Sequence, residues 1–116
     1  MEAQSLEGHV TELRRGSVVV ACLTLLVKPT YGYVLAHRLN DAGFLVEQNT
    51  LYPLLRRLEK QGLLVSEWNT DESRPRKFYR TTPEGDHAAA ALRGELDRMR
   101  AGLAALKKDN DDEPDR

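Results

Sequence analysis

The 116-residue sequence has one cysteine, one tryptophan and no apolar stretch long enough to cross a membrane. A transmembrane helix needs about 18 to 20 apolar residues, so the sequence argues against an integral membrane protein. The first residues lack the basic segment and apolar core of a secretion signal, and one cysteine cannot form a disulfide within the chain. We therefore expect a cytoplasmic protein in which Cys22 is a reduced, structural thiol.

The residue patterns of catalytic and metal sites are missing as well. His9, His37 and His87 are widely separated and lack the spacing of metal ligands. No serine or cysteine lies in a nucleophile motif. We expect a protein without enzymatic activity and without a cofactor.

The chain also has little excess charge, because its formal net charge is −1. The charges are unevenly distributed, however. Residues 51–80 contain seven lysine and arginine residues against four acidic ones, whereas residues 109–116 contain five acidic residues and one arginine. The acidic end of the chain therefore conceals a basic middle segment, which would attract nucleic acid.

The length of the chain suits one small domain. Residues 1–12 are either an N-terminal extension or a helix through Leu6, Val10 and Leu13. Residues 13–27 are apolar on nearly all sides and are followed by a proline, which predicts a buried helix. A helix of this kind must be covered on more than one side, which suggests a subunit interface.

Two shorter helices are expected next. Thr30 is a candidate N-cap for a helix over residues 31–42, which Gly43 would end. Asn49 is a candidate N-cap for a third helix, which Gly62 would end. The leucines of this third helix recur at helical spacing on one face: Leu51, Leu54, Leu55 and Leu58. Two short helices joined by a turn that contains glycine predict a helix-turn-helix.

The opposite face of the third helix is polar and basic. It combines cations with side chains that can form hydrogen bonds to base edges, as a helix in the major groove of DNA requires. The candidate DNA-binding residues of this helix are Asn49, Thr50, Tyr52, Arg56, Arg57 and Lys60. Such a face is also compatible with simple exposure to solvent, and Tyr52 is also compatible with packing inside the protein. The segment that follows the helix distinguishes these interpretations from DNA binding.

After Gly62 the apolar residues recur at every second position, which is the period of a strand. Residues 63–68 and 77–81 predict two strands, and Trp68 is expected in the core. The connecting residues 69–76 are polar and too numerous for a tight turn, and arginines lie at their tip.

A helix-turn-helix followed by a hairpin with a basic tip is the arrangement of a winged helix. The predicted fold class is mainly α with a small β-hairpin: a winged helix-turn-helix of three helices and a two-stranded wing over residues 13–82. In such folds one helix enters the major groove, and the wing lies along the backbone or in the minor groove. Arg74, Arg76 and Lys77 are the candidate DNA contacts of the wing.

A long last helix is expected over residues 83–108, because Thr82-Pro83-Glu84 provides a cap, a proline in the first turn and an acidic residue. Its apolar residues repeat in steps of four and three, at Leu92, Leu96, Met99, Leu103 and Leu106. This heptad pattern predicts a dimerisation helix, and residues 109–116 are expected to be a disordered acidic tail. A pocket between Leu96, Met99 and Leu103 and the first helix of a second subunit is a candidate site for a small aromatic effector.

Taken together, these segments resemble the PadR-like transcriptional regulators of bacteria. The similarity covers about residues 13–96, and the matching segments are Tyr31-Gly32-Tyr33, Thr50-Leu51-Tyr52-Pro53-Leu54-Leu55-Arg56-Arg57-Leu58-Glu59, Gly62-Leu63-Leu64, Glu67-Trp68 and Arg74-Pro75-Arg76-Lys77-Phe78-Tyr79-Arg80-Thr81. The resemblance implies a homodimeric winged-helix repressor in which the last helix, together with the first, forms the dimer interface. The single last helix is similar to that of the smaller subgroup of the family, some of whose members bind drugs at the dimer interface.

The sequence departs from the family pattern at several positions. Glu47-Gln48-Asn49 replaces a frequent Ser-Pro-Gly and places an acidic residue near the DNA. Ser73 replaces a glycine of the wing, and Val34 replaces a common glutamate. The last helix has no tryptophan, so the resemblance provides no aromatic clamp for a drug.

The predicted function is sequence-specific DNA binding by a homodimeric transcriptional regulator, acting as a repressor on palindromic operator DNA. A small aromatic effector that releases the DNA is a further candidate partner. The alternative is a winged-helix module that senses small molecules or binds proteins and has little affinity for DNA.

Overall fold

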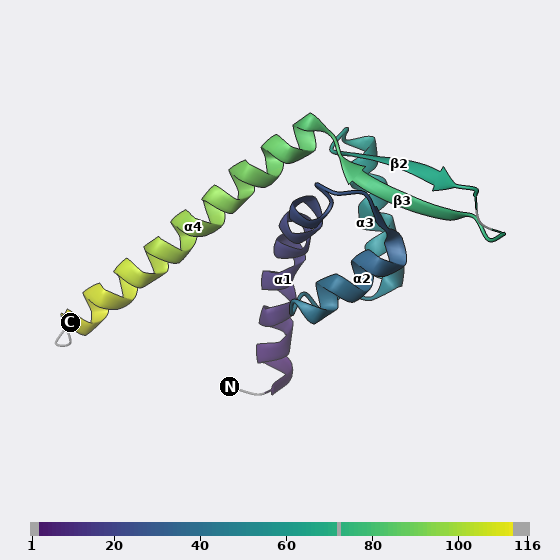
Figure 1. Ribbon diagram of the computed structural model, residues 1–116. Helices are drawn as coiled ribbons and strands as arrows, with labels where there is room; N and C mark the ends of the chain where they lie inside the picture. Colours follow the sequence, from purple (N-terminus) through teal and green to yellow (C-terminus); the bar gives the residue numbers. More distant parts are fainter. Residues whose placement is uncertain (1–2, 72, 113–116) are drawn as a thin grey trace.

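The computed structural model describes residues 3–71 and 73–112. Its elements are, in order, α1 (Ala3–Leu25), β1 (Thr30–Tyr31), α2 (Gly32–Asp41), α3 (Gln48–Lys60), β2 (Leu64–Asn69), β3 (Arg76–Thr81) and α4 (Pro83–Asp112). The helices α1, α2 and α3 form a body with the small sheet at one end, and α4 runs away from this body (Figure 1). The mainly helical fold with a β-hairpin and a long last helix is thus confirmed. None of the described helices is long and apolar enough to cross a membrane.

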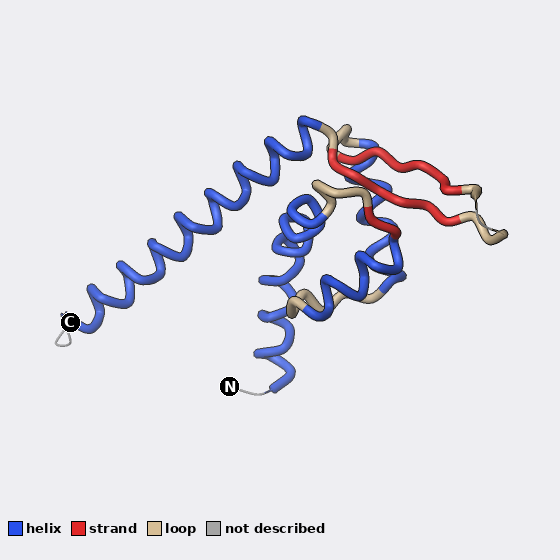
Figure 2. Tube along the Cα trace, in the orientation of Figure 1, coloured by secondary structure: helices blue, strands red, loops and turns tan. Residues whose placement is uncertain are grey.

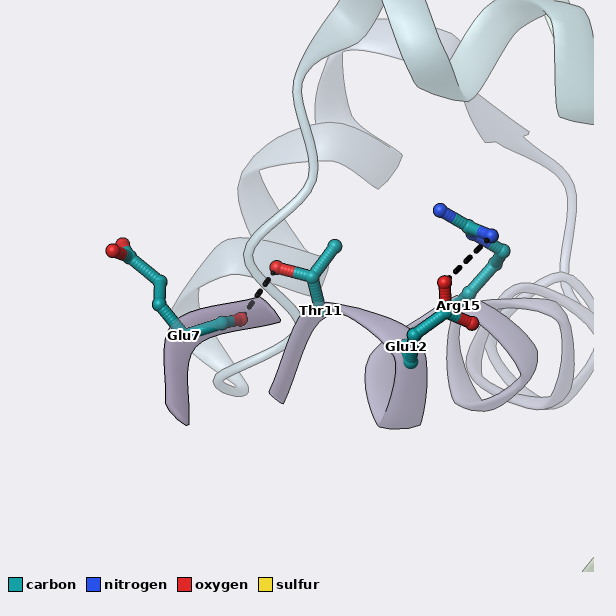
Figure 3. Close-up of polar contacts among 4 residues, drawn as sticks. All are labelled: Glu7, Thr11, Glu12 and Arg15. Atoms are coloured by element: carbon teal, nitrogen blue, oxygen red, sulfur yellow. Dashed lines mark hydrogen bonds and ion pairs between the residues drawn. The ribbon is translucent and has the colours of Figure 1, made fainter. Parts of the chain in front are cut away.

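The N-terminal helix α1 is continuous, so residues 3–12 are its first part rather than a separate extension. This first part is held by contacts within the helix itself (Figure 3). The Thr11 hydroxyl donates a hydrogen bond to the Glu7 carbonyl oxygen (2.9 Å), and Arg15 forms an ion pair with Glu12 (3.2 Å). All four of these residues are exposed, whereas the second half of α1 contributes to the core.

The segment before α2 differs from the prediction. Thr30 does not cap this helix: it lies in β1 opposite Tyr79 of β3, and its hydroxyl donates a hydrogen bond to the Lys28 carbonyl oxygen (2.9 Å). The residue that precedes α2 is Tyr31, whose side chain forms no capping hydrogen bond. In the described chain β1 adds a third strand to the expected two, in the order β1-β3-β2 (Figure 2).

The third helix, α3, places its leucines in the centre of the protein. Its buried residues are Leu51, Leu55 and Leu58. Gly62 follows the helix with a φ of +78°, a left-handed conformation that glycine adopts without strain. The expected cap at Asn49 is wrong, because α3 begins at Gln48 and its N-cap residue is Glu47. The carbonyl oxygen of Glu47 accepts the hydrogen bonds of the Thr50 and Leu51 amides (3.0 and 2.9 Å).

The core lies between the three helices of the body, the base of the hairpin and the start of α4. Its main buried side chains are Val18, Cys22, Leu23, Leu26, Leu35, Leu39, Leu51, Leu55, Leu58, Leu64, Tyr79 and Ala89. Burying an aliphatic side chain of this size contributes about 1.5–3 kcal/mol. The shared core therefore fixes α3 and the hairpin, the two elements expected to contact DNA, relative to each other.

Thr82 connects the start of α4 to the turn that follows α3. Its hydroxyl accepts a hydrogen bond from the Gly85 amide (3.0 Å) and donates one to the Gly62 carbonyl oxygen (2.6 Å), so the cap predicted here is confirmed. A side chain does not fit at Gly85, because its Cβ would overlap the Leu63 carbonyl oxygen. These contacts fix the direction in which α4 leaves the body.

The last helix continues four residues beyond its expected end at residue 108. Residues 109–112 were expected in a disordered tail, and this is wrong because no proline or capping glycine follows Lys108 before Pro114. Residues 113–116 lie outside the described residues. All side chains from Leu96 to Asp112 are exposed, and the helix is about 45 Å long at 1.5 Å per residue. The radius of gyration is accordingly 17.9 Å, against about 13 Å for a compact chain of this length.

Candidate nucleic-acid interface

The exposed face of α3 carries five of its six candidate residues: Asn49, Thr50, Arg56, Arg57 and Lys60. Four of them divide into two groups, and Asn49 lines neither of the two hollows concerned. Arg56 and Lys60 line a hollow of about 360 Å³ together with Lys77 of the hairpin. Thr50 and Arg57 instead line a hollow of about 270 Å³ beside α1. The structure therefore brings Arg56, Lys60 and Lys77 together and leaves Thr50 and Arg57 apart from them.

Tyr52, the sixth candidate of α3, is half-buried and joins α3 to α2. Its ring lies against Gly32, the first residue of α2, where an added Cβ would be only 2.8 Å from the ring atom Cε1. The sequence left open whether Tyr52 packs or binds. It packs against α2, and it also lines the surface between α2, α3 and the hairpin.

The outer end of the wing is attached to α2 by Arg76. Its guanidinium donates a hydrogen bond to the Tyr33 hydroxyl (2.6 Å), and its central carbon lies 4.9 Å from the centre of the Tyr33 ring. Arg74, nearer the tip, is exposed. Tyr33 was not among the candidates from the sequence. The signal that pointed to it is the Tyr31-Gly32-Tyr33 segment at the start of α2, next to the hairpin.

A hollow of about 520 Å³ lies between α2, α3 and the hairpin. It is lined by Gly32, Tyr33, Gln48, Tyr52, Trp68, Arg74, Pro75, Arg76, Lys77 and Tyr79. Lys77 borders both this hollow and the one beside Arg56 and Lys60, so the two adjoin. We call the combined surface the α3–wing trough. The trough unites six of the nine candidate DNA-binding residues: Tyr52, Arg56, Lys60, Arg74, Arg76 and Lys77.

The expectation that Trp68 belongs to the core is wrong. Its side chain is 62 % exposed, and it lines the trough. The Lys77 ammonium lies 5.9 Å from the centre of the Trp68 ring and 5.6 Å from that of Tyr79. The alternation of the strand was predicted correctly, but the hairpin extends beyond the body, so the inward-facing position at its outer end has no core to enter.

Glu59 is the one acidic residue among those that line the trough in the described chain. It accepts a hydrogen bond from the Ser66 hydroxyl of β2 (2.6 Å), which ties α3 to the hairpin. Burial raises the pKa of the Tyr79 hydroxyl, Glu59 and Tyr52 raise it further, and Arg56 opposes them. Tyr79 is therefore protonated at neutral pH and retains a hydrogen that it can donate.

The predicted dimerisation residues of α4 do not behave alike in the single subunit. Leu92 packs against the core. The others are exposed, with Leu96 at 39 %, Met99 at 57 %, Leu103 at 68 % and Leu106 at 63 %. The projecting half of α4 thus presents a row of large apolar side chains that the described chain does not cover.

A separate groove of about 620 Å³ lies between α1, α2 and α4. Its walls are mainly apolar, and its charged residues are Lys28, Arg38 and Arg93. Arg93 donates a hydrogen bond across the groove to the Thr24 hydroxyl (2.9 Å). Leu96 borders this groove, whereas Met99 and Leu103 do not, so it differs from the pocket expected from the sequence. Within the described residues, no three histidine, cysteine or carboxylate side chains are grouped to hold a metal ion.

A three-helix body, a basic third helix and a hairpin attached to the second helix define the class of winged-helix proteins. Residues 21–91 match the transcriptional regulator PadR-like family, and the chain belongs to this family. Its relatives are transcriptional regulators rather than enzymes.

Individual relatives agree with this assignment. The transcriptional regulator Rv3488 of Mycobacterium tuberculosis is 42% identical over 69 residues, which are 60% of this chain and 64% of that relative. The match thus spans slightly less than two thirds of that protein's length. A PadR-family transcriptional regulator from Eggerthella lenta has 46% identity and a TM-score of 0.83, over 89% of this chain and 92% of that one. A PadR-like transcription factor from Bacteroides fragilis has 29% identity and a TM-score of 0.71, over 85% and 98% of the two chains.

Proposed function

We propose that this PadR-family regulator binds operator DNA through the α3–wing trough, as a homodimer, and represses transcription. The observation that carries the proposal is the trough itself. It gathers five cationic candidate residues around two hollows that share Lys77, and the single acidic residue among its described lining is already hydrogen-bonded to the hairpin. A surface of this charge is suited to a phosphate backbone, while the exposed face of α3 is suited to base edges.

Two subunits are needed for sequence-specific binding. One winged-helix unit offers only a few base contacts, each worth about 1–3 kcal/mol of discrimination. A dimer with a two-fold axis would read two half-sites at once, which makes a palindromic operator the expected target. The uncovered leucine row of α4 supports this proposal, because large apolar side chains repeated along one helix face are typical of a helix–helix interface. A dimer bound to a promoter would block RNA polymerase, and for this reason we propose that the protein is a repressor.

The DNA upstream of the protein's own coding region is the first target to test. Binding of the labelled fragment is measured by fluorescence anisotropy over a range of salt concentrations. We expect Arg56→Ala to cost about 1–3 kcal/mol and to relax specificity at one position. Lys60→Ala should weaken binding to all sequences and lower the salt slope by about one.

A matched control is available on α4. Arg98→Ala combined with Lys108→Ala removes the same two charges from exposed positions that lie outside the trough and away from the apolar row. Full operator binding by the folded Arg56→Ala/Lys60→Ala double variant would contradict the proposal, and so would an equal loss in the control. Elution from a heparin column distinguishes DNA binding from the alternative function, because a module that senses ligands without binding DNA should elute at low salt.

We also propose that the groove between α1, α2 and α4 is where a small effector would bind. It is apolar enough for an aromatic ring, and its charged residues are all cationic, which favours an anionic compound over a cationic one. Planar aromatic acids and planar cationic drugs are compared by their effect on melting temperature and on operator affinity. If compounds of both kinds change neither the melting temperature nor the operator affinity, the groove is not an effector site.

A further inference from the structure

Trp68 is a large apolar side chain that the fold does not bury. Single exposed apolar residues are common on protein surfaces, so exposure alone does not define a site. The position of Trp68 is the informative part. It lines the α3–wing trough together with two arginines and a lysine: Arg74, Arg76 and Lys77.

The register of the hairpin explains where this side chain lies. Side chains alternate between the two faces of a strand, so Leu64, Ser66 and Trp68 share one face of β2. Leu64 is buried, and the Ser66 hydroxyl reaches Glu59 of α3. Trp68 is the next residue on this face, opposite Lys77 of β3. It therefore lies on the side of the wing that faces α3, beyond the edge of the body.

We propose that Trp68 is a DNA-contact residue, which packs its ring against the deoxyribose of a strand held in the trough and donates its Nε1–H to a phosphate oxygen. An indole combines a broad apolar surface with one hydrogen-bond donor and no acceptor. A sugar–phosphate backbone offers the complementary pair, an apolar sugar face beside an acceptor oxygen. This inference rests on the proposed DNA-binding function and assigns to it a residue of a different chemical kind from the cations.

Lys77 strengthens the assignment. Its ammonium lies 5.9 Å from the centre of the Trp68 ring, within the range of a cation–π contact. The ring and the ammonium thus occupy the same part of the trough, where one phosphate could meet both donors. An apolar protein partner is a poorer match, because docking it would take the neighbouring cations out of water without pairing them.

Trp68 is the only tryptophan of the chain, so its fluorescence reports on this position alone. Unmodified protein is titrated with an unlabelled operator duplex, while anisotropy of a labelled copy measures binding independently. We expect quenched emission and reduced quenching by acrylamide, with a midpoint that matches the anisotropy curve. Saturation of the anisotropy with unchanged emission and acrylamide quenching would overturn the inference and leave the proposed function intact. No binding by anisotropy would instead overturn the proposed function, and this inference with it.

Variants test whether the contact contributes to affinity. Trp68→Ala should weaken operator binding about tenfold, as is typical of a central aromatic contact, and leave the salt slope unchanged because no charge is removed. Trp68→Phe keeps the ring and should retain part of the affinity. Lys77→Ala should lower the salt slope by about one. Circular dichroism and the melting temperature of both Trp68 variants should match the unmodified protein, because the side chain is mostly exposed.

A double-mutant cycle separates a direct contact from a positioning role. If Trp68 touches DNA itself, Trp68→Ala weakens binding in the Lys77→Ala background as well. If its effect disappears in that background, Trp68 acts only by holding Lys77, and the direct contact is wrong. A fall in melting temperature with unchanged affinity would likewise show that Trp68 is structural. Quenching by an acidic protein fraction but not by DNA would assign the surface to a protein partner instead.

Discussion

The Arg76 guanidinium of the wing donates a 2.6 Å hydrogen bond to the Tyr33 hydroxyl of α2 and lies over its ring. A second tyrosine of the same segment, Tyr31, accepts a hydrogen bond from the Asn69 amide at the end of β2 (2.6 Å). The two tyrosine rings stack on each other, with centres 6.1 Å apart. The outer end of the hairpin is therefore held at two points, by Tyr31 of β1 and by Tyr33 of α2. Arg76, the residue held by Tyr33, is a cation of the trough.

Tyr33→Phe keeps the ring but removes the hydroxyl that positions Arg76. We expect operator affinity to fall by up to about fivefold, because the hydrogen bond that holds Arg76 in place is worth about 1 kcal/mol. The free energy of unfolding should fall by no more than the same amount. Anisotropy titrations against the labelled operator provide the measurement. Tyr31→Phe is the matched control, since it also removes a hydroxyl attached to the wing but leaves Arg76 in place. Equal losses in both variants would mean that the stiffness of the wing matters rather than the position of Arg76.

Leu103→Glu places a charge at the most exposed residue of the apolar row on α4. In the single subunit this carboxylate stays in water, so we expect the variant to fold. In the proposed dimer it would be buried without a partner, at a cost of several kcal/mol, and the protein should become monomeric. Light scattering and operator binding are measured together. Ala101 lies about 200° from Met99 around the helix at 100° per residue, so the control variant Ala101→Glu should remain dimeric. If Leu103→Glu is still a dimer, the subunit interface lies elsewhere.

Gly85→Ala should destabilise the fold because the new methyl group would meet the Leu63 carbonyl oxygen, which is backbone and cannot move aside alone. Overpacking of this kind costs about 1–3 kcal/mol, measured as the free energy of unfolding in denaturant. Gly102→Ala is the control, because an added Cβ there meets nothing within 4 Å. That change should stabilise α4 by up to about 1 kcal/mol through helix propensity. Similar effects of the two substitutions would contradict the close approach at Gly85.

Burial raises the pKa of the Cys22 thiol from 9.0 to about 12. The folded state therefore holds this proton more tightly than the unfolded state does. The resulting stability is fully present below pH 9 and is lost as the pH rises toward 12, on the order of 4 kcal/mol in all. Unfolding free energies at increasing pH should fall more steeply for the unmodified protein than for Cys22→Ala. A thiol reagent that labels the native protein at pH 8 as fast as the unfolded protein would contradict this burial.

Local signals in the sequence predicted much of this fold. The leucine spacing and the final glycine of α3, the alternation of the hairpin and the Thr82 cap each depend on neighbouring residues, and each agrees with the structure. The third strand could not be predicted in this way. β1 has two residues and exists because it pairs with β3, which lies almost fifty positions further along the chain.

The candidate site was predicted less completely than the fold. Helical periodicity places Arg56 and Lys60 on the outer face of α3, but it does not tell which side of that face the hairpin will approach. Thr50 and Arg57 therefore looked equivalent to them and lie elsewhere. Trp68 was misassigned for a related reason, because alternation gives the face of a strand and not the distance over which the core follows it.

Beyond Leu96, α4 extends through sixteen more residues to Asp112, which span about 24 Å at 1.5 Å per residue. In the proposed dimer this part of α4 would act as a lever between the subunit interface and the two DNA-binding surfaces, each formed by α3 and the wing. A tilt of about 10° where α4 leaves the body would move its far end by about 4 Å, given that helix rise. Successive turns of a DNA groove are about 34 Å apart, so such a displacement in both subunits would bring the two α3 helices out of step with the operator. A compound bound beside the start of α4 could therefore release the DNA without touching any residue that contacts DNA.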